Sequence, residues 1–224
     1  MEILEYVIKI GGSLLKYPLE LRSLCEIIPH AFEKSRLCVI PGGGIFSDCV
    51  RNVYRTYGLS DDIAHWMAIM GMDQYGMLLN FLIPRSKTVS ELREIERVIS
   101  EGKIPILLPY RYLRNNDVLP HSWDVTSDSI ALLIAGELNV KRVILVKDVD
   151  GIFDKNPRTS ESAALIPRLT AREVAKLESS CIDKYSHNLI RKYKITCIIL
   201  NGRYPERLIA ALNKENVPST VILP

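Results

Sequence analysis

Three polar loops, each directly after a short apolar run, contain the residues of this chain that could bind an anion. They are Gly11-Gly12-Ser13, Gly42-Gly43-Gly44 and a segment that begins at Lys147. Glycine lets backbone N–H groups approach an anion closely, and the N-terminus of a following helix favours negative charge. Lys9 lies two residues before the first loop. The pair of glycine loops suggests two anionic groups bound side by side; the alternative is two tight turns without a ligand.

The common nucleotide-binding motifs are missing from the sequence. Gly102-Lys103 is followed by Ile104, so there is no GxxxxGK[ST] motif, and the run GGGIFSD lacks the last glycine of GxGxxG. These departures exclude a P-loop protein and a typical dinucleotide-binding protein.

Composition narrows the class of protein further. The chain has 224 residues, of which 47% are apolar and 25% charged, with a net charge of 29 − 26 = +3. Such a chain can bury a sizeable core, and its charge is too mild to indicate a nucleic-acid partner. Five cysteines without CxxC spacing, none of them in the three polar loops, are typical of reduced thiols. With no signal peptide and no long uncharged apolar stretch, we expect a cytoplasmic protein without a membrane partner.

Strands and helices are expected to alternate along the chain. Apolar runs predict strands over residues 3–10, 36–40, 104–108, 142–146, 195–200 and 219–222. Helical periodicity and capping residues predict helices over 19–34, 45–57, 61–83, 90–100, 126–138, 170–177 and 205–213. Pro29 should kink or divide the first helix, and residues 109–125 should be irregular. This order predicts an α/β layered fold around a mostly parallel sheet, with ligands at the strand ends.

The chain resembles the amino acid kinase superfamily in four motifs that occur in the family's order. They are KIGGSLLK, PGGG, TSDSIALLIA and ILVKDVDGIFDKNP, and they span residues 7–157. The segment around Cys181-Ile182-Asp183-Lys184 resembles the family's lysine-bearing loop. The resemblance implies an αβα sandwich of two lobes. Residues 1–120 would bind a phosphomonoester acceptor, and residues 121–224 would bind ATP. The nucleotide would carry Mg²⁺, and phosphates rather than a protein metal site would largely hold this ion.

The same resemblance assigns roles to individual residues. Lys9 and Lys184 would neutralise the transferring phosphoryl group, with Asp128 holding the lysines in place. The phosphoryl oxygens would accept from Gly11, Gly12 and Ser13, and the acceptor would lie against Gly42, Gly43 and Gly44. The nucleotide would contact Lys147, Asp148, Asp150, Gly151, Phe153, Asn156 and Pro157. Without the resemblance, Asp128 could simply be a carboxylate that stabilises a helix N-terminus by roughly 0.3–1 kcal/mol.

The run from His121 to Ser129 is similar to the archaeal branch of the family that acts in methanofuran biosynthesis. That branch implies 5-(aminomethyl)furan-3-ylmethyl phosphate as the acceptor and its diphosphate as the product. In this interpretation His121 and Trp123 belong to the acceptor site, where the indole would stack on the ring and Asp124 would pair with the ammonium group. The alternatives are a core tryptophan and a histidine that caps loop backbone.

Three alternatives stay open at this point. One is a uridylate kinase or another phosphomonoester or carboxylate kinase of the same fold, and another is a nucleotide or anion binder without catalysis. The third concerns the methionine-rich apolar pattern over residues 61–83, which indicates either core packing or a subunit contact. A homodimer or larger homo-oligomer is therefore expected.

Overall fold

The computed structural model describes residues 4–157, 159–177 and 180–224. Its strands form one eight-stranded sheet in the order β3-β4-β2-β1-β5-β7-β8-β6. The strands are β1 Tyr6–Ile10, β2 Leu37–Pro41, β3 Ser86–Val89, β4 Ile104–Leu107, β5 Arg142–Lys147, β6 Arg168–Thr170, β7 Thr196–Asn201 and β8 Ser219–Leu223. All pairs are parallel except β7 with β8. The expected α/β fold with a mostly parallel sheet is therefore confirmed.

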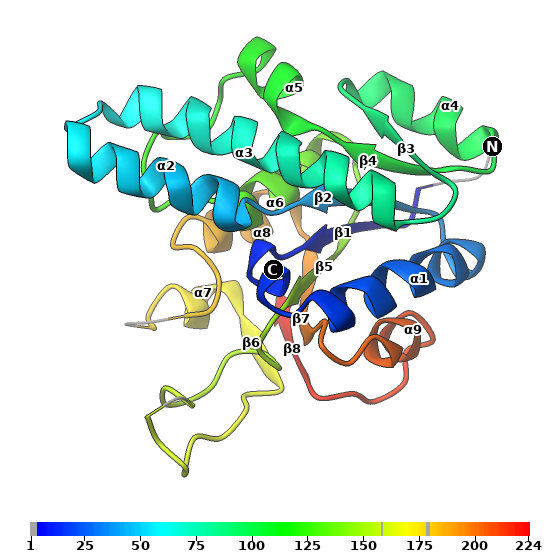
Figure 1. Cartoon of the computed structure of the whole chain (residues 1–224). Coiled ribbons are helices and arrows are strands. Elements are labelled where there is room, and N and C mark those ends of the chain that lie inside the picture. Colours follow the sequence, from blue (N-terminus) through cyan, green and yellow to red (C-terminus); the bar gives the residue numbers. More distant parts are fainter. Residues whose placement is uncertain (1–3, 158, 178–179) are drawn as a thin grey trace.

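Helices flank this sheet on both sides (Figure 1). They are α1 Pro18–Lys34, α2 Gly44–Tyr57, α3 Asp61–Leu82, α4 Ile95–Ser100, α5 Pro109–Asn115, α6 Ser127–Glu137, α7 Ala171–Val174, α8 Ser186–Tyr193 and α9 Glu206–Leu212, with short 3-10 turns at Gly12–Lys16 and Leu92–Glu94. Strands β1 to β4 form one half of the sheet and β5 to β8 the other. The boundary between the halves therefore lies between β1 and β5, at the centre of the molecule.

The central strands are apolar because both of their faces are covered. Every residue of β1 and of β2 is buried, and the four middle residues of β5 are buried as well. Buried parallel strands have continuous apolar runs of this kind. The register aligns Ile10 with Pro41 on one side and with Val146 on the other. The loops after β1, β2 and β5 therefore emerge together at one edge of the sheet.

Several local predictions were wrong, and each has a physical reason. Pro29 lies inside α1 without dividing it, because the helix keeps an apolar face buried through Leu24, Ile28 and Phe32. That packing outweighs the roughly 3 kcal/mol that an interior proline costs.

The helix expected from Ser90 begins instead with a capping box between Glu91 and Glu94. A second capping box at Thr170 was predicted correctly, although its helix ends at Val174 rather than at residue 177.

Besides the short 3-10 turn at Gly12–Lys16, four elements were not predicted. β3 and β6 are short strands at the two edges of the sheet, and α5 lies within residues 109–125, which were expected to be irregular. Helix α8 is the fourth. Short elements carry too few residues for a period to be read, so tertiary packing decides them. Among the described residues, no helix is long and apolar enough to cross a membrane.

Candidate active site

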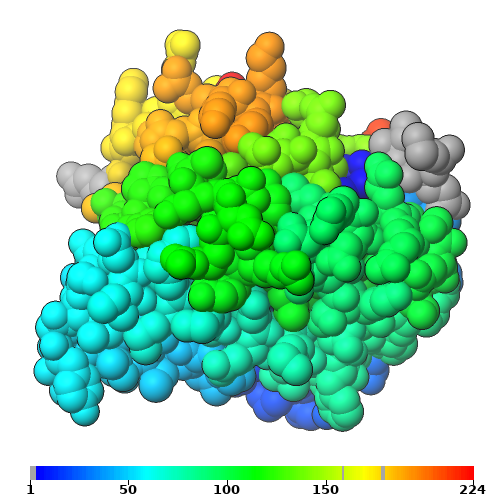
Figure 2. All heavy atoms as spheres, turned by 90° about the horizontal axis from the view of Figure 1, so that it is seen from above, coloured from blue at the N-terminus to red at the C-terminus, as the bar shows by residue number. Residues whose placement is uncertain are grey.

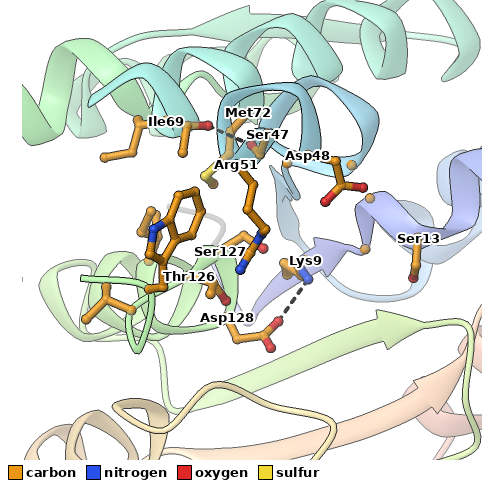
Figure 3. Close-up of a pocket in the computed structure, with 18 of the residues that line it drawn as sticks. Lys9, Ser13, Ser47, Asp48, Arg51, Ile69, Met72, Thr126, Ser127 and Asp128 are labelled. Atoms are coloured by element: carbon orange, nitrogen blue, oxygen red, sulfur yellow. Dashed lines mark hydrogen bonds and ion pairs between the residues drawn. The ribbon is translucent and has the colours of Figure 1, made fainter. Parts of the chain in front are cut away.

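A buried carboxylate between two lysines lies at the centre of the sheet edge. Nζ of Lys9 lies 2.8 Å from Oδ1 of Asp128, and Nζ of Lys147 lies 2.6 Å from Oδ2. Lys9 is 4% exposed and Asp128 is 2% exposed, so water screens these charges poorly. Figure 3 shows Lys9 and Asp128 facing each other across the floor of a cavity. The cluster has a net charge of +1 and opens toward that cavity.

The sheet register brings the three groups together. Lys9 on β1 has Leu145 of β5 as its Cα partner, so Lys147, two residues further, lies on the same face as Lys9. Helix α6 packs against β1 and β5 on that face, and Asp128 is its second residue. A strand repeat of two and one helix N-terminus therefore place the carboxylate between the two ammonium groups.

The charges of the cluster stabilise one another. Burial alone would raise the pKa of Asp128, but the ammonium groups of Lys147 and Lys9 outweigh it and lower the pKa to about 2. Burial opposes the charge of Lys147, yet Asp128 raises the pKa of that lysine. The pKa of Lys9 is lowered, chiefly by burial. Asp128 is therefore ionised at neutral pH, and it holds the lysines rather than acting as a base.

The two glycine loops pack directly on each other, backbone to backbone. A Cβ on Gly12 would collide with the backbone N of Gly44, and a Cβ on Gly42 would lie 2.5 Å from the N of Gly12. Gly44 also has a φ of 56°, in the left-handed region that favours glycine. The two glycine loops therefore lie side by side at this edge of the sheet. Gly11, Gly12, Ser13, Gly43 and Gly44 line the cavity next to Lys9.

The cavity has a volume of about 500 Å³ and runs between the glycine loops and the segment 122–128. Its far wall is formed by Ile69 and Met72 of α3, and Trp123 lies opposite α2. Volumes of this size suit small ligands that are largely enclosed.

Arg51 was missed by the sequence analysis. It lies on α2 and points into the cavity toward Ser127 and Asp128 (Figure 3). Its guanidinium stacks 4.1 Å from the centroid of the Trp123 ring. The available signal was its position one helical turn after Ser47, close behind the second glycine loop, since residues four apart share a helix face. Arg51 adds a second cation to the site, separate from the lysine cluster.

Asp124 and Lys184, both predicted as site residues, do not line the cavity. Their side chains are 60% and 80% exposed, and Nζ of Lys184 lies 3.2 Å from Oδ1 of Asp124. Lys147, predicted only as a nucleotide contact, thus takes the place beside Asp128 that was expected for Lys184. His121 lies between the carboxylates of Asp62 and Asp117, with N–O distances of 2.6 and 2.9 Å, and its ring packs against those of His65 and Trp66. Both ring nitrogens face carboxylates, so His121 does not cap loop backbone. Among the described residues that line the cavity, His121 is not present.

Asp183 is a second residue that the sequence analysis left without a role. Its carboxylate accepts hydrogen bonds of 2.6 to 3.0 Å from the backbone N–H and hydroxyl groups of Thr126, Ser129 and Ser186. These bonds cap α6 and α8 together. Because Asp128 lies between Thr126 and Ser129, Asp183 fixes the start of the helix that presents the central carboxylate.

The segment predicted to bind the nucleotide continues from the cavity toward β8. Asp148 lines the cavity, whereas Asp150 accepts from Asn201 and Arg207 at 2.9 and 2.7 Å. A Cβ on Gly151 would collide with Oγ1 of Thr220. Beyond these residues, Phe153 pairs with Leu165, the carbonyl of Asn156 accepts from two following N–H groups, and Pro157 lies in that turn.

Cys181 lies outside the three polar loops, as the sequence indicated for all five cysteines, yet it lies next to the site. It lines the cavity, and its thiol donates to the carbonyl of Gly151 with an S–O distance of 3.4 Å. Burial raises the pKa of this thiol to about 11, so it is protonated at neutral pH.

Comparison with known proteins gives this geometry a family. The model of the amino acid kinase family matches residues 5–201. The chain belongs to this family. Family membership makes the protein an ATP-dependent phosphotransferase and confirms the resemblance seen in the four motifs.

Curated members of the amino acid kinase family differ in their acceptors. [5-(Aminomethyl)furan-3-yl]methyl phosphate kinase of Methanocaldococcus jannaschii is 33% identical over 97% of both chains. Uridylate kinase of Methanococcoides burtonii is 23% identical over 94% of this chain and 92% of the relative.

Solved kinase structures share the fold. Uridylate kinase from Archaeoglobus fulgidus has a TM-score of 0.75 at 21% identity, covering 97% of this chain and 99% of that one. UMP kinase from Ureaplasma parvum has a TM-score of 0.79 at 19% identity, with both chains fully covered.

Proposed function

We propose that the protein transfers the γ-phosphoryl group of ATP to a small phosphomonoester, and that this acceptor is 5-(aminomethyl)furan-3-ylmethyl phosphate. The observation that carries the proposal is the cavity itself, with the Lys9–Asp128–Lys147 cluster at its floor and Arg51 as a second cation on its wall. Two phosphorylated substrates need cations at two places. The 33% identical relative, which acts on that furan phosphate, supports the choice of acceptor.

The chemistry requires positioning and charge neutralisation more than covalent catalysis. A phosphate acceptor is already an anion near neutral pH, so its oxygen can attack without a general base. Lys9 and Lys147 would neutralise the transferring phosphoryl group, and the N–H group of Gly12 would bind its oxygens. The N–H group of Gly11, expected from the sequence to bind them as well, instead donates to the carbonyl of Val146 at 2.8 Å. The buried setting strengthens these interactions because water does not compete for them.

Mg²⁺ fits the oxygen donors that line the cavity. The carboxylates of Asp48 and Asp148 lie on the cavity wall, and carboxylate and phosphate oxygens are the ligands this ion prefers. These two residues would hold the ion together with the phosphates. When bound, Mg²⁺ supplies further neutralisation of charge on the phosphoryl group.

ATP is proposed to bind to the lobe of residues 121–224. The loop from Asp148 to Pro157 leads away from the cavity next to β8, and Asp150 is held by Arg207 of α9. Lys184 lies on the neighbouring loop, where a nucleotide phosphate could replace Asp124 as its partner.

The acceptor is proposed to bind to the lobe of residues 1–120, between the glycine loop at 42–44 and α3. Arg51 would bind its phosphate and Trp123 would stack on the furan ring. Asp61 is better placed than Asp124 for the ammonium group, because it lines the cavity and its carboxylate accepts from the hydroxyl of Tyr54 at 2.9 Å. An ammonium group bound there would lie at the end of the cavity away from the lysines.

A panel of acceptors tests this proposal. ADP formation would be followed with ATP, Mg²⁺ and one acceptor at a time: the aminomethylfuran phosphate, UMP or isopentenyl phosphate. We expect turnover with the furan phosphate to exceed the others by at least tenfold in kcat/KM. Preference for UMP would support the uridylate kinase alternative, and ATP binding without turnover on any acceptor would support the non-catalytic one.

A homodimer formed through α3 is also proposed. Ile63, Met70, Met77 and Phe81 share one face of this helix, and their exposed fractions run from 40 to 81%. Figure 2 shows the cyan residues of α2 and α3 at one end of the molecule, beside the green residues of α5. Such a stripe is a large apolar surface for a monomer.

Light scattering tests the proposed dimer. The wild type should be a dimer and Phe81→Lys a monomer, whereas the control Leu19→Lys on α1 should stay dimeric. A monomeric wild type would contradict the proposal.

A further inference from the structure

A group of histidines and aspartates lies where the start of α3 meets the segment after α5, and one of its members, His65, lines the cavity. Asp62 and His65 come from the first turns of α3, and Asp117 and His121 come from the segment between α5 and α6. One ligand atom from each of His65, Asp117 and His121 lies within 4.8 Å of the other two. The kinase chemistry proposed above uses none of these three side chains.

His121 is oriented as metal-binding histidines are. Its Nδ1 lies 2.6 Å from Oδ1 of Asp62, and its Nε2 lies 2.9 Å from Oδ1 of Asp117. A histidine that binds a metal through one ring nitrogen commonly donates its other N–H to a carboxylate, which fixes the tautomer. With Nδ1–H donating to Asp62, the lone pair of Nε2 faces the Asp117 carboxylate. A cation between those two atoms would satisfy both.

His65 supplies the third donor. Its ring stacks on that of His121, with centroids 4.1 Å apart and planes 19° apart. Within the described part of the chain, its ring nitrogens take no hydrogen bond that would prevent a rotation of the ring. Two ligands that bind one tetrahedral ion at about 2.1 Å lie roughly 3.4 Å apart. The three donors therefore have to close in. Because the lone pairs of two stacked rings do not point at one ion, the ring of His65 has to turn out of its stack on His121 for both to bind it.

We propose that His65, Asp117 and His121 bind a divalent transition-metal ion of the zinc class, with Asp62 orienting His121. Two imidazole nitrogens and one carboxylate oxygen suit Zn²⁺ or Co²⁺ better than Mg²⁺, which prefers oxygen donors alone. The ion would join α3 to the segment that continues into Ser122 and Trp123, two residues that line the cavity. Its role would be to fix that wall of the cavity, separate from phosphoryl transfer.

Metal titration of the untagged chain tests the site. The protein would be stripped with EDTA and titrated with Co²⁺ and with Zn²⁺, followed by visible absorption and calorimetry in excess Mg²⁺. Trp66 gives a second readout, since its ring lies 5.0 Å from His65 and 5.2 Å from His121, centroid to centroid. A bound Co²⁺ ion should quench its fluorescence, measured in a Trp123→Phe background so that Trp66 is the only tryptophan.

One ion per chain is expected. His65→Gln, His121→Gln and Asp117→Asn should each weaken binding at least tenfold, and Asp62→Asn should weaken it by about tenfold or more. His30→Gln and His187→Gln are the matched controls, because the chain has four histidines and these two lie outside the cluster. Circular dichroism would establish that each variant is folded. Absence of saturable binding by the wild type would overturn the proposal, and His121 would then serve only to link the two carboxylates. Equal weakening of binding by the control variants would overturn it as well.

Discussion

Lys147 and Asp128 form a short ion pair at the end of β5, with Nζ 2.6 Å from Oδ2. Lys9 occupies the other carboxylate oxygen, so Asp128 has both oxygens engaged. Each lysine enters from a different strand, and the helix that carries Asp128 covers both strands. The geometry of the cluster is therefore set by the sheet register, which fixes where the positive charge meets the cavity.

Lys147→Ala is expected to lower kcat by about 10², because removing one preorganised donor to the transition-state charge typically has an effect of 10²–10³. Lys184→Ala is the matched control, since that lysine is 80% exposed and pairs with Asp124 at the surface. It should affect the KM for ATP more than kcat. Steady-state kinetics of both variants with ATP and the furan phosphate make the comparison. A larger fall of kcat in Lys184→Ala than in Lys147→Ala would reverse the assignment of the second lysine.

Lys9→Ala should lower kcat by roughly 10²–10³ while ATP binding changes little. The side chain is 4% exposed and lies beside the first glycine loop, where charge moves during phosphoryl transfer. Turnover would be measured together with nucleotide affinity from equilibrium titration. A variant that turns over within threefold of the wild type would refute the site assignment.

Asp128 should make stability depend on pH in a defined window. Its pKa is lowered from 3.8 to about 2 in the folded protein, so the stability it contributes is complete above about pH 4 and is lost as pH falls toward 2. Asp128→Asn removes this contribution and leaves the buried Lys9 and the partly buried Lys147 without their anionic partner, at a loss of about 3–5 kcal/mol near neutral pH. Urea unfolding of both proteins between pH 2 and 7 should give a difference that shrinks below pH 4. A difference constant over that window would contradict the ion-pair account.

Asp61→Asn should raise the KM for the amine-bearing acceptor by about tenfold, since charged hydrogen bonds contribute about 1.5–3 kcal/mol. An analogue with methyl in place of the aminomethyl group should lose little, because it makes no such contact. Asp124→Asn is the control and should leave both acceptors nearly unchanged. If Asp124→Asn affected the amine-bearing acceptor and Asp61→Asn did not, the ammonium group would have to be assigned to Asp124, as the sequence first suggested.

Much of the site could be predicted because its signals are local. The glycine loops follow continuous apolar strands, and parallel strands bring their carboxyl ends to one sheet edge, so Lys9 and both loops were placed correctly. The role of Asp128 came from the family resemblance, since a helix start alone indicated only a carboxylate that stabilises a helix N-terminus. For Lys9 and the glycine loops, one short run of residues contains both the strand and the polar loop that follows it.

Other features depend on contacts between distant segments. The partner of Asp128 is decided by the register between β1 and β5, which places Lys147 on the face of Lys9. The place of Arg51 in the cavity depends on how α2 packs, and the hydrogen bonds of Asp183 depend on where its loop meets α6. The edge strands β3 and β6 are three to four residues long, and pairing with their neighbours determines them.

Acceptor-dependent formation of ADP, with the phosphorylated product identified by mass spectrometry, tests the central claim most directly. The account predicts that the aminomethylfuran phosphate is converted to its diphosphate with a kcat/KM at least tenfold above that for UMP or isopentenyl phosphate. It also predicts that Lys9→Ala abolishes most of this conversion. Turnover that is higher with UMP, or no turnover on any of the three acceptors, would contradict it.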